Sequence, residues 1–408
     1  MDPYKNTDPN IFYEILINIP KDELKLFFKL SDRIKTVTKD NEAFWKDKTE
    51  YDYPKCINVG KISWKLFYKQ CSGKIYSFGS NIFGQLGYDN TDYVKNPTLI
   101  SNSDGATHIA SFATHSAIVI NKSLYTFGNN ICGQLGHGHV GLLTVPTLVP
   151  NLENVIHVSC GCVHTAVIAN DHLYTFGWNR YGQLGNDCVH SSTPICFSQF
   201  KNPTYVACGY YYTAVIENGN LYTFGDNANY QLGHDHNKDL FVPTHVPNLK
   251  NVTHVACGLN HTVVIANGNL YTFGCNKYGQ LIHNENKLNV PTMILSCLTS
   301  SNDVLELKNI THISCGKKWT SLIINKKLYV FGKLYGIQQR GLVLENIGNI
   351  SYIVSNQLHS AVISNKKLYT FSRDNIQSDG KIIPYLVPDL DNVKCVSIGH
   401  RYNIVLCS

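Results

Sequence analysis

The pentapeptide Leu124-Tyr125-Thr126-Phe127-Gly128 decides the fold of this chain, because near-copies of it recur along most of the sequence. The tyrosine of each copy is found in turn at Tyr76, Tyr125, Tyr174, Tyr222, Tyr271, Tyr329 and Tyr369. A period of about 50 residues indicates a repeat array. Within each copy an aliphatic, an aromatic, a hydroxyl-bearing and an aromatic residue alternate before glycine, which is typical of a short β-strand with two differently packed faces.

Three further runs accompany the pentapeptide in each repeat. In one well-defined copy, residues 157–161 and 164–168 precede the pentapeptide at 173–177, and turn-forming residues bound each run. A glycine-rich loop follows at 179–185, and a fourth run opened by proline follows such a loop, as at 146–150. Four short antiparallel strands per repeat, arranged radially, are typical of the blades of a β-propeller.

The two ends of the array predict how the ring closes. It begins with only a third and a fourth strand, at residues 75–78 and 97–100, and it ends with only a first and a second, at 393–398 and 402–406. Together these halves make one blade. The sequence therefore predicts a mainly β protein in which residues 71–408 form a seven-bladed propeller closed by pairing of the N- and C-terminal strands, preceded by a small all-α domain.

A nonapeptide after the pentapeptide identifies the repeat more closely. The pattern Gly-x-Asn-x-x-Gly-Gln-Leu-Gly stands at 79–87, 128–136 and 177–185, with weaker copies at 225–233 and 274–282. Together with Cys-Gly-x-x-His-Thr, it resembles the regulator of chromosome condensation repeat family of seven-bladed propellers. The resemblance implies a fold directly, whereas function depends on the site. The family's founding members are nucleotide-exchange factors for a small GTPase, and binding to chromatin or nucleic acid is a further possibility.

Residues 1–70 contain none of the repeat and read as helices. Apolar residues recur at helical spacing, Pro20 interrupts them, and Asp40 or Asn41 could cap a further turn that contains Phe44 and Trp45. This segment resembles an F-box, which binds the Skp-type adaptor of a cullin ubiquitin ligase. The resemblance implies an adaptor-binding surface at Ile11, Ile15, Leu16, Ile19, Pro20, Leu24, Leu30 and Trp45. The alternative is a helical cap on the propeller, built from the same apolar residues.

The composition is that of a globular protein, with 43% hydrophobic and 16% charged residues and a formal net charge of +6. No 18-residue apolar run and no secretory signal occur, so we expect a protein inside the cell, in the cytoplasm and/or nucleus, without a membrane partner. We also expect a monomer. The excess of Lys over Arg suggests an AT-rich genome, such as that of some protists or large DNA viruses; a viral protein would act in the host cell.

Recurring cysteines and histidines are predicted to be structural. Equivalent repeat positions carry Cys160, Cys208, Cys257 and Cys315, and a second set carries His115, His164, His261 and His359. A catalytic residue is needed once, so one histidine per blade predicts a structural hydrogen bond. The pairs His137/His139 and His234/His236 have a spacing compatible with metal ligation, but each pair alone is weak evidence. With no P-loop and no Gly-x-Ser-x-Gly, we predict no enzyme activity, no metal and no cofactor.

The loops of the propeller are the expected place of function, because a rigid scaffold presents its variable residues there. The nonapeptide loops share one face with the Cys-Gly-x-x-His-Thr turns. We predict a partner-binding face at Trp178, Arg180, Tyr181, Tyr210, Tyr211, Lys277, Tyr278, Lys317 and Lys318. The leading hypothesis is a substrate receptor of a ubiquitin ligase that holds an unknown protein target on this face. Nucleotide exchange on a small GTPase and binding to chromatin or nucleic acid remain as alternatives.

Overall fold

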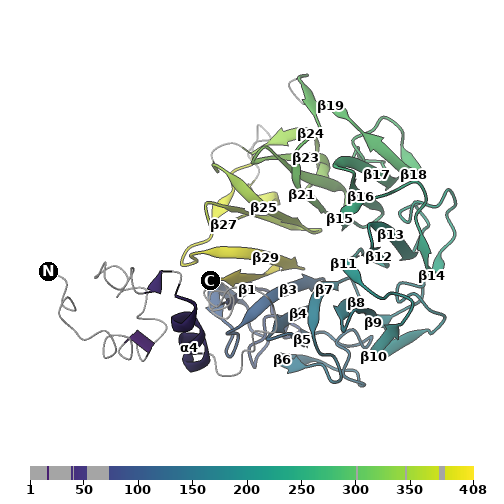
Figure 1. Ribbon diagram of the computed structural model, residues 1–408. Coiled ribbons are helices and arrows are strands. Elements are labelled where there is room, and N and C mark those ends of the chain that lie inside the picture. Colours follow the sequence, from purple (N-terminus) through teal and green to yellow (C-terminus); the bar gives the residue numbers. More distant parts are fainter. Residues whose placement is uncertain are drawn as a thin grey trace.

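The computed structural model describes residues 16–17, 38–39, 41–52, 73–299, 302–344, 347–375 and 382–408. Seven four-stranded antiparallel sheets stand around a central axis (Figure 1). The predicted mainly β, seven-bladed propeller is therefore confirmed. Apolar clusters lie between neighbouring blades, as where Val119 and Leu124 of one blade pack with Val158 and Phe176 of the next.

Blade I closes the ring as predicted. Its inner strands are β29 (Val393–Gly399) and β30 (Tyr402–Cys407), and its outer strands are β1 (Lys74–Gly79) and β2 (Val94–Leu99). The two halves pair antiparallel between β1 and β30, with Lys74 opposite Cys407 and Gly79 opposite Tyr402. This pairing gives both ends of the propeller chain a hydrogen-bonded neighbour and leaves no blade half-formed.

The other six blades follow in chain order. Blade II contains β3 (Ala106–Phe112), β4 (His115–Ile120), β5 (Ser123–Gly128) and β6 (Leu143–Leu148). Blade III contains β7 (Val155–Cys160), β8 (His164–Ala169), β9 (His172–Trp178) and β10 (His190–Phe197). Blade IV contains β11 (Pro203–Cys208), β12 (Tyr212–Glu217), β13 (Asn220–Gly225) and β14 (Leu240–His245). Blade V contains β15 (Val252–Cys257), β16 (His261–Ala266), β17 (Asn269–Cys275) and β18 (Lys287–Ile294).

Blades VI and VII are complete although they lack the nonapeptide. Blade VI contains β21 (Ile310–Cys315), β22 (Trp319–Ile324), β23 (Lys327–Leu334) and β24 (Ile337–Val343). Blade VII contains β25 (Ile350–Ser355), β26 (His359–Ser364), β27 (Lys367–Ser372) and the two-residue β28 (Tyr385–Leu386), with a short 3-10 helix η1 (Arg373–Asn375) after β27. Between blades V and VI, the hairpin of β19 (Ser296–Leu298) and β20 (Val304–Glu306) projects from the ring (Figure 1).

The polar residues of the repeat fix the nonapeptide loop to its own blade. In blade II, Thr126 Oγ1 of the pentapeptide donates to the carbonyl of Leu135 (2.7 Å), and Asn130 Oδ1 accepts the N–H of the same leucine (3.0 Å). Gln134 Oε1 accepts the N–H of Cys132 (2.9 Å). Gly136 has a φ of 81°, and a Cβ there would lie 2.9 Å from the Phe176 ring of the next blade. The motif residues therefore serve the scaffold and leave the intervening positions free.

The second-to-third strand turns need residues that tolerate left-handed backbone. In blade II, Asn121 and Lys122 have φ values of 50° and 63°, and Asn325 and Lys326 of blade VI have 50° and 65°. Two successive residues with positive φ are typical of type I′ hairpin turns, which match the twist of the strands they join. Asparagine supplies the first position at low cost because its short polar side chain tolerates this conformation.

The described helix of the N-terminal region is α4 (Glu42–Asp52). Asn41 caps it, with Oδ1 accepting the N–H of Phe44 (3.0 Å), as one of the two predicted caps requires. Phe44 and Trp45 are buried, and Lys48 Nζ donates to the carbonyl of Ile17 (2.8 Å). Within the described residues, no helix is long and apolar enough to cross a membrane. The bounds of a separate domain at 1–70 stay a prediction.

Candidate protein-interaction face

The recurring histidines join neighbouring blades. His115 Nε2 lies 3.0 Å from Thr165 Oγ1 of the next blade, and that hydroxyl donates to the carbonyl of Gln134 (2.7 Å). Because the hydroxyl proton is committed to Gln134, the histidine must donate through Nε2. His164 and His261 make the same contact with Thr213 (3.0 Å) and Thr320 (3.1 Å). These histidines are structural, as the repeat predicts.

Burial keeps these imidazoles neutral. The pKa of His115, His261 and His359 falls to about 4, and that of His164 to about 3, because desolvation disfavours the charged ring. In blades I and IV tyrosine takes the histidine position: Tyr402 donates to the carbonyl of His115 (2.6 Å), and Tyr212 donates to the carbonyl of His261 (2.6 Å). A neutral polar contact therefore crosses from blade to blade around most of the ring.

Neither histidine pair is arranged for metal binding. His137 Nε2 lies 2.9 Å from the Thr126 hydroxyl, and His234 Nε2 lies 2.9 Å from that of Thr223, so each ring belongs to the polar network of its own blade. Among the described residues, no group of three or more His, Cys, Asp or Glu side chains could hold a metal ion.

The recurring cysteines also serve the packing of inner strands. The Sγ of Cys208 donates to the carbonyl of Ser159 (3.4 Å), and the Sγ of Cys315 donates to that of Ala256 (3.4 Å), each on the preceding blade. Burial raises the pKa of the Cys208 thiol to about 12. These thiols are therefore protonated packing groups.

The predicted partner-binding residues gather in two clusters. The first, called here the aromatic cluster, contains Trp178, Tyr181, Tyr210 and Tyr211 of blades III and IV. The Trp178 ring lies 5.6 Å from both Tyr181 and Tyr211, and Tyr211 lies 5.8 Å from Tyr210. All four side chains are half-buried, and Arg180 is exposed beside them. This arrangement gives a contiguous aromatic surface from residues far apart in sequence.

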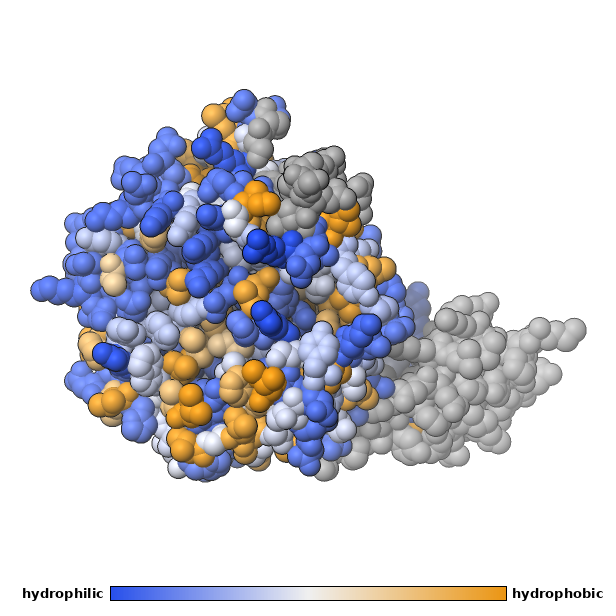
Figure 2. All heavy atoms as spheres, turned by 180° about the vertical axis from the view of Figure 1, so that it is seen from behind, coloured by the Kyte–Doolittle hydropathy of each residue, from blue (hydrophilic) through white to orange (hydrophobic). Residues whose placement is uncertain are grey.

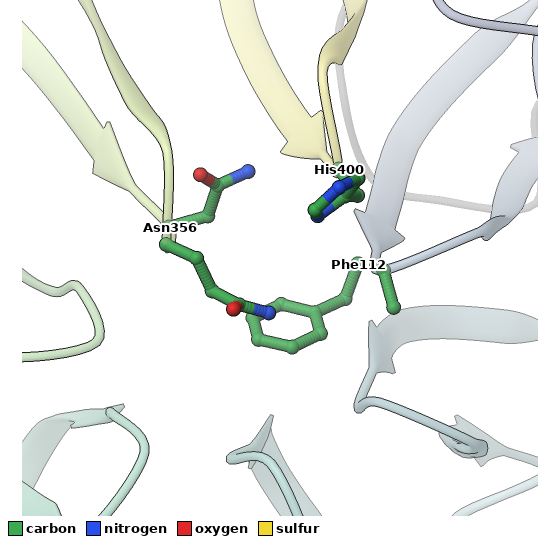
Figure 3. Close-up of a pocket in the computed structure, with 5 residues that line it drawn as sticks. Phe112, Asn356 and His400 are labelled. Carbon is green, nitrogen blue, oxygen red and sulfur yellow. The ribbon is translucent and has the colours of Figure 1, made fainter. Parts of the chain in front are cut away.

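The aromatic cluster extends to one residue that the repeat pattern did not single out. Phe112 stands at the end of β3, where the repeat usually has glycine, and its ring lies 5.3 Å from Tyr210. Figure 3 shows Phe112, Asn356 and His400 turned toward one another around a small pocket. This depression is open to solvent and encloses no room for a water molecule, so it is too shallow to hold a small molecule.

The second cluster, called here the lysine–tyrosine cluster, contains Lys277, Tyr278, Lys317 and Lys318 of blades V and VI. Lys318 Nζ lies 4.5 Å from the centroid of the Tyr278 ring, and Lys333 Nζ lies 5.9 Å from it. Lys333 was not predicted, although it follows Gly332 as Trp178 follows Gly177. A comparison of the residue that follows the pentapeptide glycine in each repeat would have identified Lys333.

Hydrophobic and hydrophilic residues are unevenly distributed around the ring. In Figure 2 hydrophobic residues gather over the lower part, where Figure 1 places blades II and III, and hydrophilic residues predominate above, at blades V and VI. In the loop between β5 and β6 of blade II, Ile131 and Val140 are 66% and 62% exposed.

The repeats themselves match a known family model. Regulator of chromosome condensation (RCC1) repeats are matched at residues 72–119, 122–168, 170–216, 218–265 and 267–323, and a second model of the same repeat matches 252–280. The chain belongs to the RCC1 repeat family. The matches stop at residue 323, within blade VI, because blades VI and VII lack the nonapeptide that carries most of the motif. No curated protein sequence matches this chain significantly.

Solved structures share the RCC1-type propeller. Human WBSCR16 superposes with a TM-score of 0.71 and 18% identity, over 82% of this chain and 99% of that one. Prp20p of Saccharomyces cerevisiae, described with its binding properties to Gsp1p and histones, gives a TM-score of 0.68 and 17% identity, over 85% of this chain and 94% of that one. Yeast RCC1 (Prp20) bound to Kap60 gives the same score and identity, over 82% and 88%. Identities of this size show the shared fold.

Of the predicted adaptor-binding residues, Leu16 and Trp45 belong to the described part of the chain. Leu16 is fully buried, and Trp45 is 5% exposed and donates through Nε1 to the carbonyl of Thr38 (2.8 Å). Both residues therefore contribute to a helical core. The remaining six lie outside the described residues, namely Ile11, Ile15, Ile19, Pro20, Leu24 and Leu30.

Proposed function

We propose that this RCC1-repeat propeller recognises a protein partner on the face that carries the nonapeptide loops. The aromatic cluster is the observation that carries the proposal. Within the described residues, no hydrogen bond reaches the indole N–H of Trp178 or the phenol of Tyr181, and both rings are half-buried. Trp and Tyr with a free polar tip are typical anchors of protein interfaces.

The small GTPases are the partner class that we propose first. Nucleotide exchange is the activity that the RCC1 resemblance implies, and Prp20p, which has the same fold, is described with its binding to Gsp1p. The exchange factor acts by binding, so it needs a surface and no catalytic constellation. Such a partner would place this protein inside the cell.

The test replaces two anchors of the aromatic cluster. We expect Trp178→Ala with Tyr181→Ala to weaken binding by about 2 kcal/mol or more, which is roughly 30-fold in Kd. The matched control is Val145→Ala with Leu148→Ala, an exposed apolar pair on the outer strand β6 of blade II.

Proteins retained by the intact chain and by the control, but lost with the aromatic variant, are identified after affinity purification. A GTPase among them is then purified and loaded with a fluorescent guanine nucleotide, whose release is timed with and without the propeller. Retention of every partner by the aromatic variant would place recognition elsewhere.

A second candidate function is that of a substrate receptor held by a Skp-type adaptor and cullin ligase. It is favoured by helix α4, where Phe44 and Trp45 pack inward and Lys48 bonds to Ile17, as expected for a folded helical unit at the position of the F-box resemblance. Purification of the full chain beside a version lacking residues 1–70 tests it. Adaptor and cullin lost with the truncation would support the receptor, and a GTPase retained by the truncated propeller would support exchange.

A further inference from the structure

The lysine–tyrosine cluster has a fixed framework. Gln338 Nε2 of blade VI donates to the carbonyl of Tyr278 (2.7 Å) and so fixes the nonapeptide loop of blade V against its neighbour. The N–H of Lys333 donates to the carbonyl of Lys318 (2.9 Å), which sets the two side chains side by side. Both ammonium groups then approach the same ring of Tyr278. Backbone contacts therefore bring these two lysines and Tyr278 together, and the ammonium groups meet at the tyrosine ring.

The cluster carries positive charge without a compensating acid. Within the described residues, Lys277, Lys317, Lys318 and Lys333 make no ion pair, and the ion pairs found there, such as Lys367–Asp391, belong to other positions. The Lys318 hydrogen bond, followed by the charges of Lys318, Lys277 and Lys333, holds the pKa of the Tyr278 phenol below its ordinary value. Four like charges raise the local potential and attract an anion.

The surroundings favour an acidic peptide over nucleic acid. The loop between β13 and β14 of the adjacent blade IV carries Asp226, Asp235 and Asp239, so the basic sector is interrupted on this side. A phosphate backbone needs a continuous basic stripe, since its charges follow one another along the whole strand. A short acidic segment needs only one such patch.

We propose that the lysine–tyrosine cluster binds an acidic segment of the protein partner, with carboxylates paired to Lys318 and Lys333 above the Tyr278 ring. This inference rests on the proposed function and names the chemistry of one part of the partner. The aromatic cluster supplies apolar anchors, and the lysine–tyrosine cluster fixes which end of the partner lies over blades V and VI, because charge pairs at an interface set orientation and association rate.

The experiment measures binding of a fluorescein-labelled ten-residue peptide of alternating Glu and Gly to the full chain, by anisotropy at low salt. A peptide with Gln in place of Glu is the neutral comparison. We expect Lys318→Glu with Lys333→Glu to weaken binding of the acidic peptide at least tenfold. The control is Lys201→Glu with Lys250→Glu, which makes the same charge change at exposed loops on the opposite face. This control should retain most of the binding, and both variants should melt as the parent does.

Equal loss in the control, or equal binding of the Gln peptide, would overturn the proposal. Tighter binding of a 20-nucleotide single-stranded DNA that is lost with Lys318→Glu and Lys333→Glu would assign the cluster to nucleic acid and overturn it too. The proposed function has a separate readout, because it depends on loss of the protein partner with Trp178→Ala and Tyr181→Ala. If binding of the partner is weakened by Trp178→Ala with Tyr181→Ala but unchanged by Lys318→Glu with Lys333→Glu, this inference is wrong and the proposed function still stands.

Discussion

Replacing Tyr402 with phenylalanine tests how strongly the two ends of the propeller are coupled. Tyr402 is fully buried on β30, and its hydroxyl crosses from blade I to blade II. It donates to the carbonyl of His115 (2.6 Å) and lies 3.0 Å from the Ser116 hydroxyl. Phenylalanine fills nearly the same volume, so the change removes these polar contacts and little packing.

The expected cost follows from what each partner keeps. Ser116 still donates to the carbonyl of Gln85 (2.8 Å), so its loss is small. The carbonyl of His115 loses a short bond in a buried site, but His115 stays paired with Phe112 in the β3–β4 ladder. With about 1 kcal/mol for each buried hydrogen bond, we expect Tyr402→Phe to lower the free energy of unfolding by about 1–2 kcal/mol.

Urea unfolding followed by tryptophan fluorescence measures this cost as a shift of the midpoint at unchanged slope. The matched control is Tyr125→Phe, since Tyr125 is half-buried and, in the described part of the chain, no hydrogen bond reaches its hydroxyl. Tyr212→Phe removes the corresponding bond between blades IV and V, where the carbonyl of His261 keeps the N–H of Gly258 (2.9 Å). We expect similar costs for Tyr402→Phe and Tyr212→Phe, because both hydroxyls make the same contacts, and a smaller cost for Tyr125→Phe. A Tyr402 variant as stable as the Tyr125 variant would refute the coupling argument.

Three further predictions concern the same contacts. Removal of residues 392–408 takes away the inner strands of blade I, so the truncated chain should lose cooperative melting in calorimetry; an unchanged transition would contradict ring closure. The buried imidazoles of His115, His261 and His359 have a pKa of about 4 in the folded chain and about 6.5 in the unfolded chain. Their contribution to stability is therefore fully present above pH 6.5 and is lost as the pH falls from 6.5 towards 4. The free energy of unfolding should fall by up to about 1.4 kcal/mol per pH unit for each histidine. His261→Gln should make the measured slope shallower, and an equal slope would count against this cause. Gly258→Ala would place a Cβ 2.4 Å from the His261 ring and should cost about 1–3 kcal/mol; a urea midpoint equal to that of the parent would contradict this clash.

The fold could be predicted from the sequence because most repeats contain the strand pattern of a whole blade. The pentapeptide gives a strand whose Leu and Phe are buried, and the half-blades at 75–100 and 393–406 require each other to complete a sheet. The outer strands of blades VI and VII were harder to predict, because no nonapeptide precedes them in the sequence. In blade VI, Tyr335 makes the contact with the next blade: its hydroxyl donates to the carbonyl of Phe371 (3.1 Å) in blade VII and lies 3.1 Å from the Ser360 hydroxyl. A single tyrosine in a tight hairpin carries no repeat signal.

The candidate site could be predicted only as positions, since contacts between blades depend on the ring's geometry. The sequence places Trp178 and Tyr211 on loops of the same face, but it does not say that their rings lie 5.6 Å apart. Phe112 was missed because it interrupts the motif, and Lys333 because blade VI lacks the loop that marks this position. Both residues join clusters through neighbours that are more than fifty positions away or on another strand.

Only some positions of the nonapeptide are available for contact with a partner. Its Asn, Gln, Leu and Gly residues are committed to the loop framework, so binding energy can come only from the positions between them. Those positions carry Ile82 and Phe83 in blade I, Ile131 and Cys132 in blade II, Arg180 and Tyr181 in blade III, Ala228 and Asn229 in blade IV, and Lys277 and Tyr278 in blade V. Aromatic residues thus occur on blades I, III and V, and only around blades III and V do the turns of the next blades, IV and VI, add Tyr210, Tyr211, Lys317 and Lys318. A standard interface buries about 800 Å² on each partner, which suits a footprint on four adjacent blades better than the whole ring. We therefore expect the partner to sit off the propeller axis, over blades III to VI, with its apolar part toward blade III and its acidic part toward blade VI.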